Sequence, residues 1–244
     1  MGRSDMGWDG YYSLKAVDQW ISVINSNLAG STRIGFKSTK VKFKGGVAEV
    51  VRTPTSTLIG LQMPESNLSI AATTIDFSQG SIVNSTEPSH LAIQGPGFFC
   101  VKERAGTITY YTRDGEFFID ANGCILNSSG LYLVYSNGAY AVFDYTNNVI
   151  ASYNETNLAY TKQVQFLKYS RYGSTIFEKG TSDINTNFVS VGQATVVFQS
   201  LETSNTSISQ SIPELSLAQK MFSALSKVIQ VHQTDLDTVI NLIR

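Results

Sequence analysis

Few side chains in this sequence of 244 residues are of the types that perform catalysis or bind metals. Its two histidines are His90 and His232, and neither has another histidine or a cysteine at the spacing of metal ligands. We interpret His90 as part of a polar loop before a strand and His232 as a tolerated polar position on a helix. The sequence therefore predicts no metal site.

Asp114 and Glu116 are two residues apart, a spacing that places two carboxylates on one face of a strand, as glycoside hydrolysis requires. However, Asp114 precedes Gly115 as the first residue of an Asp-Gly turn, which accounts for it without catalysis. There is no GxSxG motif, and Gly95-Pro96-Gly97 precedes a strand-like run rather than the helix of a phosphate-binding loop. We predict no catalytic residue, no cofactor and no enzymatic activity.

Cys100 and Cys124 are too few for a disulfide framework, and we expect buried free thiols. Both lie near strands of one predicted sheet, so a bond between them stays open at this stage.

The charge balance argues against polyanionic and membrane partners. Lys and Arg total 18 and Asp and Glu total 19, which gives a net charge of −1 and no basic footprint for nucleic acid. No stretch approaches the roughly 18 apolar residues of a membrane span. The first residues, MGRSDMGWDG, contain no apolar run of a signal peptide. We expect no nucleic-acid partner, no membrane insertion, and any export to proceed without a cleaved signal.

Exposed aromatic side chains would favour a carbohydrate-binding or adhesive module. The sequence offers several candidates within its β-rich part, although we favour core and subunit-interface roles for them. They are Tyr110, Tyr111, Tyr132, Tyr135 and Tyr140.

The elements that would position these groups begin with a long C-terminal helix, Glu214 to Arg244. Steps of three and four residues trace a heptad seam along it. Other apolar residues lie beside that seam, so the apolar face is wider than one partner helix covers. The seam consists of Leu215, Ala218, Phe222, Leu225, Ile229, His232, Leu236, Val239 and Ile243; beside it lie Met221, Val228, Val231, Ile240 and Leu242.

A second helix, Tyr11 to Ala29, is the natural first partner. Its seam has the same spacing, and Gly30 follows as a stop signal. We predict that the two terminal helices pair as a coiled coil and become ordered together on self-assembly. The N-terminal seam consists of Leu14, Val17, Ile21, Ile24 and Leu28.

Between the helices, alternating hydrophobic residues predict β structure. Lys40 to Lys44 and Val47 to Val51 flank Gly45-Gly46 as a hairpin, and Thr53 to Ser69 is interpreted as a linker arm. The lysines of the hairpin are interpreted as a solvated strand face. Short strand-like runs then follow each other as an up-and-down meander, separated by Asp114-Gly115, Asn122-Gly123 and Asn137-Gly138 turns. The predicted strands are Leu91 to Ile93, Gly97 to Lys102, Thr107 to Arg113, Glu116 to Asp120, Cys124 to Leu126, Leu131 to Tyr135, Ala139 to Phe143, Val149 to Tyr153, a strand around Val164 and Phe166, and Phe188 to Phe198.

These elements give an α+β fold, with paired terminal helices and a central all-β, meander-rich domain. We predict a helical assembly domain from residues 1–37 and 205–244. Residues 38–70 form the hairpin and linker arm, and residues 71–204 form a β-rich outer domain.

Several motifs resemble those of flagellar rod and hook proteins, in the same order along the chain. The helix-end motif includes Asn27 and Gly35-Phe36-Lys37, and the C-terminal motif includes Leu201-Glu202-Thr203-Ser204-Asn205. The central motif runs from Asp76-Phe77-Ser78-Gln79-Gly80 through Leu91-Ala92-Ile93-Gln94-Gly95-Pro96-Gly97-Phe98-Phe99 to Tyr111-Thr112-Arg113-Asp114-Gly115-Glu116-Phe117. The motif residues singled out are Asn27, Gly35, Phe36, Gly95, Gly97, Phe98, Phe99, Thr112, Arg113 and Gly115.

The resemblance implies a structural subunit that assembles helically into a hollow axial tube of the bacterial flagellum, built through a type III export channel. Its partners would be further copies of itself and adjoining rod or hook proteins, in the basal body. The length and the Gly95-to-Phe99 run make a distal rod protein the closer analogue.

The chain departs from the family pattern at Gly30, where Asn is usual, at Arg33, where Thr is usual, and at Leu225-Ser226-Lys227, where an Asn-Ser-Lys run is usual. We interpret the Gly30 change as mild, because both residues end helices. The other two keep alternatives open: a repurposed surface filament, or a soluble carbohydrate- or protein-binding β module with a helical stalk.

Overall fold

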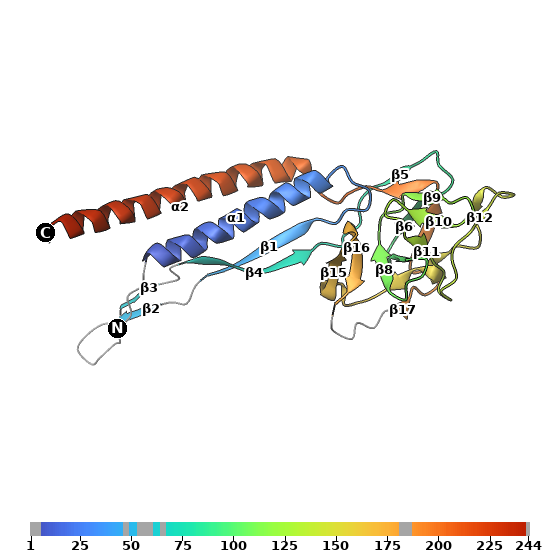
Figure 1. Ribbon diagram of the computed structural model, residues 1–244, viewed down its shortest axis with the longest axis horizontal. Helices are drawn as coiled ribbons and strands as arrows, with labels where there is room; N and C mark the ends of the chain where they lie inside the picture. Colours follow the sequence, from blue (N-terminus) through green and yellow to red (C-terminus); the bar gives the residue numbers. More distant parts are fainter. Residues whose placement is uncertain (1–5, 46–48, 53–60, 64–66, 181–186, 243–244) are drawn as a thin grey trace. The chain divides into compact units, whose positions relative to one another are not determined.

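A computed structural model describes residues 6–45, 49–52, 61–63, 67–180 and 187–242, and it divides the chain into two compact units (Figure 1). The helical unit contains Met1–Leu28, Thr39–Thr74 and Ser207–Arg244. The sheet unit contains Ala29–Ser38 and Ile75–Thr206. In this division, the residues that we predicted to form a separate hairpin and linker arm belong mostly to the same unit as the two helices.

The helical unit contains two long helices, α1 (Met6–Gly30) and α2 (Ile208–Leu242), which run in opposite directions (Figure 1). They share one hydrophobic cluster, in which Val17, Ile24 and Ala218 are buried. Helix α2 begins six residues before the predicted start and passes through Pro213. Pro213 is the sixth residue of this helix, past its first turn, so it removes one backbone hydrogen bond and crowds the Ser209 carbonyl, and the helix nevertheless begins before it.

The predicted hairpin of the helical unit was wrong in its pairing. Strand β1 (Thr39–Gly45) pairs with β4 (Leu68–Ile75), whereas β2 (Glu49–Arg52) pairs with β3 (Leu61–Met63). In the described part of the chain β1 and β2 are therefore not partners, and Gly46 of the predicted turn lies outside the described residues. Burial of apolar side chains against the helices explains the choice. Phe43 of β1 contacts the Trp20 ring, with centroids 5.3 Å apart, and Leu68 of β4 joins the α1–α2 cluster. Much of the predicted linker, residues 53–60 and 64–66, lies outside the described residues.

The sheet unit is built on a seven-stranded antiparallel sheet. The predicted simple meander was wrong, because β8 and β9 are not neighbours and Asp114-Gly115 between them is not a hairpin turn. A Cβ on Gly115 would lie 1.6 Å from the Leu91 oxygen, so this segment runs closely against strand β6. The sheet order is β15 (Leu167–Ser170), β16 (Gly173–Lys179), β8 (Thr109–Thr112), β7 (Phe99–Lys102), β11 (Tyr132–Leu133), β10 (Ile125–Asn127) and β9 (Phe117–Ile119).

The two Asn-Gly turns were predicted correctly. Gly123 has φ 76° and its N–H donates to the Asp120 oxygen at 2.8 Å, which closes the turn between β9 and β10. Gly138 has φ 83° and donates to the Tyr135 oxygen at 2.9 Å. Glycine tolerates these left-handed conformations without steric cost.

Shorter strands complete the sheet unit in pairs. The predicted strand at Val164 and Phe166 is instead a 3-10 turn, η2 (Val164–Phe166), because two alternating apolar residues also fit a single turn. The predicted strand Phe188 to Phe198 is two strands with a turn between them. The pairs are β5 (Ile82–Asn84) with β19 (Ser200–Glu202), β6 (Leu91–Gln94) with β18 (Thr195–Phe198), β12 (Phe143–Asp144) with β13 (Val149–Ile150), and β14 (Ala159–Tyr160) with β17 (Asn187–Phe188); a second 3-10 turn is η1 (Glu155–Asn157).

Candidate functional site

The histidines lie in different units. His90 is 8% exposed, and its Nδ1 lies 2.7 Å from the Ser85 hydroxyl. His232 is half-buried on α2. Within the described ranges no cluster of three or more His, Cys, Asp or Glu side chains could hold a metal ion.

Asp114 forms its hydrogen bonds within its own loop. Its carboxylate accepts the Glu116 N–H at 3.0 Å, and its N–H donates to the Thr112 hydroxyl at 3.0 Å. Burial raises the pKa of the Asp114 carboxyl to about 6. This hydrogen bonding assigns the side chain to loop structure rather than to a carboxylate pair.

Both cysteines are free thiols, which answers the question of a bond between them. Cys100 is buried, and burial raises the pKa of its thiol to about 12. A thiol with so high a pKa is a poor nucleophile at neutral pH.

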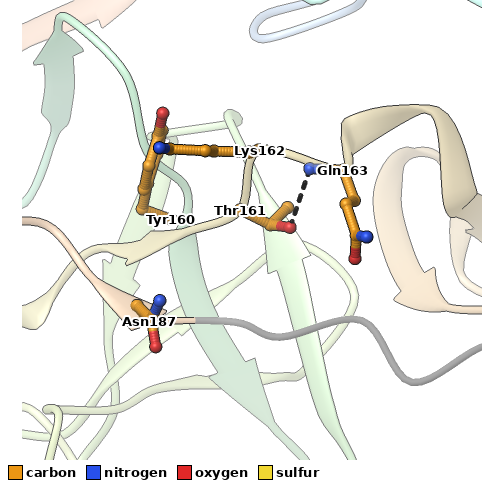
Figure 2. Close-up of a pocket in the computed structure, with 5 residues that line it drawn as sticks. All are labelled: Tyr160, Thr161, Lys162, Gln163 and Asn187. Atoms are coloured by element: carbon orange, nitrogen blue, oxygen red, sulfur yellow. Dashed lines mark hydrogen bonds between the residues drawn. The ribbon is translucent and has the colours of Figure 1, made fainter.

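One small pocket of about 240 Å³ opens in the sheet unit. Figure 2 shows its lining, Tyr160, Thr161, Lys162, Gln163 and Asn187, in which the Gln163 N–H donates to the Thr161 hydroxyl at 3.1 Å. None of these lining groups is a carboxylate, an imidazole or a thiol.

The tyrosines proposed as a carbohydrate platform divide between core and surface. Tyr110 and Tyr111 are 3% and 5% exposed and belong to the hydrophobic cores, which excludes them from a binding surface. Tyr135 donates its hydroxyl to the Ala151 oxygen and packs on the larger core. Tyr132 and Tyr140 contact one another with ring centroids 5.4 Å apart, and Tyr140 is 36% exposed.

The motif residues instead meet at a buried junction within the sheet unit, centred on Lys37, Arg113 and Glu202. The Lys37 ammonium lies 2.6 Å from Glu202 Oε1, and the Arg113 guanidinium lies 3.1 Å from Oε2. The side chains of Lys37 and Glu202 are 0% exposed and that of Arg113 is 5% exposed. Neighbouring backbone groups complete the bonding: Lys37 donates to the Ser78 oxygen, Arg113 to the Gly95 oxygen, and Gly80 N–H to Glu202.

Desolvation dominates the electrostatics of this junction. Burial lowers the pKa of the Lys37 ammonium and of the Arg113 guanidinium, and the Glu202 carboxylate opposes both shifts. Breaking such a buried pair is costly even where forming it contributes little, because the remaining charges stay buried. Glu202 therefore holds two cations from distant parts of the chain in place.

Close backbone approach explains why the motifs contain glycine. Gly35 has φ 65°, and a Cβ there would lie 2.4 Å from the Asp114 nitrogen. Gly95 and Gly97 have φ values of 107° and 130°. A Cβ on Gly30 would lie 2.4 Å from the buried Phe36 ring, so Asn is not a mild replacement there, contrary to our interpretation.

Other motif residues fix the ends of the same segments. In the helical unit, Asn27 exchanges two hydrogen bonds of 2.8 Å with the Thr39 backbone. In the sheet unit, the Asn205 amide donates to the Asp76 and Ser78 oxygens, and its carbonyl accepts the Ser38 N–H. Phe98 is 4% exposed and lies in the smaller hydrophobic core, and Phe99 is 0% exposed and lies in the larger one. The buried Thr112 hydroxyl donates a hydrogen bond of 2.7 Å to the Thr175 oxygen.

Sequence reasoning singled out Gly35, Phe36 and Arg113 but not the roles of Lys37 and Glu202. The available signal was a lysine that directly follows Gly35-Phe36 and a glutamate that directly follows Leu201. Their pairing spans 165 positions of sequence, so no local pattern reveals it.

The predicted helical seams lie in the helical unit, where their buried part can be followed residue by residue. Val17 and Ile24 are 0% and 2% exposed, and Leu14, Ile21 and Leu28 are half-buried. On α2, Ala218 is 0% exposed, while Leu215, Phe222, Leu225 and Ile229 are half-buried. Ile243 lies outside the described residues.

The C-terminal part of α2 has an exposed apolar face. A Cβ on Gly10 of α1 would lie 3.0 Å from Ile229, and α2 continues past the described start of α1 (Figure 1). Leu236 and Val239 are consequently 49% and 51% exposed. In a soluble monomer such a continuous face is unusual and indicates a binding surface.

Comparisons with known proteins find similarity to flagellar hook and rod proteins. Residues 92–150 match the family model of the Flagellar hook protein FlgE/F/G D1 domain. The flagellar hook protein FlgE of Helicobacter mustelae is 32% identical over 129 residues, which is 50% of this chain and 28% of that protein. FlgE of Helicobacter pylori (strain ATCC 700392 / 26695) is 31% identical over 130 residues, 51% of this chain and 18% of that protein.

A rod protein matches over a longer range. The flagellar basal-body rod protein FlgG of Bacillus subtilis (strain 168) is 24% identical over 261 residues, covering 97% of this chain and 98% of that protein. The chain thus spans less than a third of the two hook proteins but nearly all of this rod protein.

Proposed function

We propose that this chain, which is similar to flagellar hook and rod proteins, is a rod-type subunit that self-assembles helically into a hollow axial tube. Its partners in this proposal are further copies of itself and adjoining rod or hook proteins. The near-complete match to a rod protein supports the rod type over the hook type.

The exposed apolar face of α2 carries the proposal. In the helical unit, Gly10 of α1 lies beside Ile229 of α2, and Leu236, Val239 and Ile240 farther along α2 are 49%, 51% and 61% exposed. Burying apolar surface contributes about 25 cal/mol per Å² removed from water. Helices of adjacent subunits would supply that burial, with α1 and α2 paired as the coiled-coil assembly domain and the sheet unit as the outer layer.

The buried junction gives the sheet unit a supporting role. It ties residues 35–37, which follow α1 in the chain, and residues 200–205, which precede α2, to the central strands of the sheet unit. The proposal assigns these residues to structure and no residue to catalysis.

For location, we propose the axial structure of the bacterial flagellum. In the described part of the chain, no helix combines the length and apolarity needed to cross a membrane.

A charged substitution in the exposed face tests this function. We expect Leu236→Asp to prevent polymerisation at concentrations where the unaltered chain forms long particles, because an unpaired carboxylate would enter an apolar contact. Gln230→Asp adds the same charge to α2 away from the seam and should polymerise normally. Sedimentation and light scattering against concentration measure the outcome, and circular dichroism checks that the sheet unit stays folded.

Either of two results would contradict the proposal. One is that the unaltered chain remains monomeric at all concentrations. The other is that its assembly stops at a dimer, as it does when the contact is isologous.

A further inference from the structure

Helix α2 carries a second heptad seam that α1 does not cover. Each residue of this second seam directly precedes a residue of the first, so the two seams lie about 100° apart around the helix. The second seam consists of Leu217, Met221, Ala224, Val228, Val231, Asp235, Thr238 and Leu242.

This second seam is exposed along the helix. Leu217, Val228, Val231 and Leu242 are 53%, 61%, 60% and 81% exposed, and only Met221 also contacts the α1–α2 cluster. A repeat of seven residues matches a helical partner, since knobs spaced in this way enter holes formed by four residues of a facing helix. The occupant is therefore a helix.

A shallow surface hollow lies beside the second seam. It has a volume of about 410 Å³ and is lined by Ser216, Gln219, Lys220, Ser223, Ala224 and Lys227. Ser223 and Ala224 lie between Lys220 and Lys227 in the sequence, so small side chains and positive charge are available to a neighbouring side chain there.

The charges of the second seam select the partner and its register. Asp235 occupies a core position of the seam, and Lys227 flanks the seam one heptad earlier. Neither residue forms an ion pair with the rest of the described chain. A parallel pair of α2 helices in equal register would place two Asp235 carboxylates opposite each other, which is unfavourable.

A shift of seven residues, about 10.5 Å along the axis, removes that conflict. Asp235 of one copy then enters the hole formed by Ala224, Lys227, Val228 and Val231 of the next, with the Lys227 ammonium as its counter-charge. The same contact can repeat on the next copy, so it is open-ended.

We propose that the second seam binds α2 of an adjacent copy in parallel, shifted by one heptad, with an Asp235–Lys227 ion pair between copies. This inference rests on the proposed function, because an axial polymer presents its subunits in one direction. It adds the contact surface, the register and the pair that specifies them.

A charge-exchange experiment tests the pair. Asp235→Lys alone places two cations at the contact and Lys227→Asp alone places two carboxylates there. Each variant by itself should need at least about tenfold more protein to polymerise. An equimolar mixture of the two variants should polymerise like the unaltered chain, because every contact then joins opposite charges.

Asp237→Lys is the matched control, since it makes the same charge change outside the second seam and should polymerise normally. Circular dichroism confirms that each monomer keeps its helix content. Particle length by negative-stain microscopy distinguishes tubes from dimers.

Three results would overturn the inference while leaving the proposed function intact: single variants that polymerise like the unaltered chain, variants that the mixture does not rescue, or a rescue that yields discrete antiparallel dimers. Failure of the unaltered chain to polymerise would instead refute the proposed function itself.

Discussion

Removing the charge of Glu202 is the sharpest test of the buried junction. Glu202→Gln preserves the volume of the side chain, so no cavity forms. The amide oxygen can still accept from Lys37 and the Gly80 N–H, but the amide nitrogen faces the Arg113 guanidinium, which is also a donor. Two buried cations would lose the carboxylate that they share.

The expected loss follows from the burial of these groups. Lys37 and Glu202 are 0% exposed, so solvent screens the pair very little. Breaking a buried ion pair by removing one partner costs about 3 to 5 kcal/mol. At a typical dependence of about 2 kcal/mol per molar urea, the unfolding midpoint of the sheet unit should fall by about 2 M.

The tyrosine signal reports the loss of stability of the sheet unit. All tyrosines except Tyr11 and Tyr12 lie in the sheet unit, whereas Trp8 and Trp20 both lie in the helical unit. Urea unfolding followed by near-UV circular dichroism of tyrosine therefore reports the junction. Glu87→Gln, at an exposed position, is the matched control. A loss below about 1 kcal/mol, comparable to the control, would refute the account of the junction.

Two further predictions concern the loop after β8. Burial raises the pKa of the Asp114 carboxyl from its usual value of 3.8 to about 6. Between these two pH values the folded chain therefore binds more protons than the unfolded chain. The free energy of unfolding should fall as pH rises through this range, by at most about 3 kcal/mol. Asp114→Asn should flatten that dependence and raise stability at pH 7.5, as measured by urea unfolding at several pH values; an unchanged pH profile would contradict it. Gly115→Ala should destabilise the sheet unit by about 3 kcal/mol or more, since its Cβ would overlap the Leu91 oxygen. Gly106→Ala meets only the Glu103 side chain and serves as control, and equal melting temperatures of the two variants would contradict the reasoning.

The sequence predicted the features that depend on local pattern. Seam residues such as Val17 and Ala218 are buried between the helices as the heptad spacing indicates. The Asn-Gly turns at Gly123 and Gly138 adopt the expected left-handed φ values. Periodicity and turn chemistry act over a few residues, so they are visible without a structure.

Pairing between distant segments was not predictable in this way. The partner of β1 is β4 rather than the nearby β2, because burial against α1 outweighs the proximity of a Gly-Gly pair. Asp114-Gly115 has the composition of a hairpin turn but is buried against β6. The ionic junction joins Lys37, Arg113 and Glu202 across the chain, and only their shared motifs linked them beforehand.

The central claim is that this chain is an open-ended structural subunit assembled through its terminal helices. Negative-stain microscopy of concentrated unaltered protein, with the Leu236→Asp variant beside it, tests that claim most directly. An open-ended helical subunit should give long hollow tubes from the unaltered chain and single particles from the variant. Single particles or dimers from the unaltered chain at every concentration, or tubes from the variant, would contradict it.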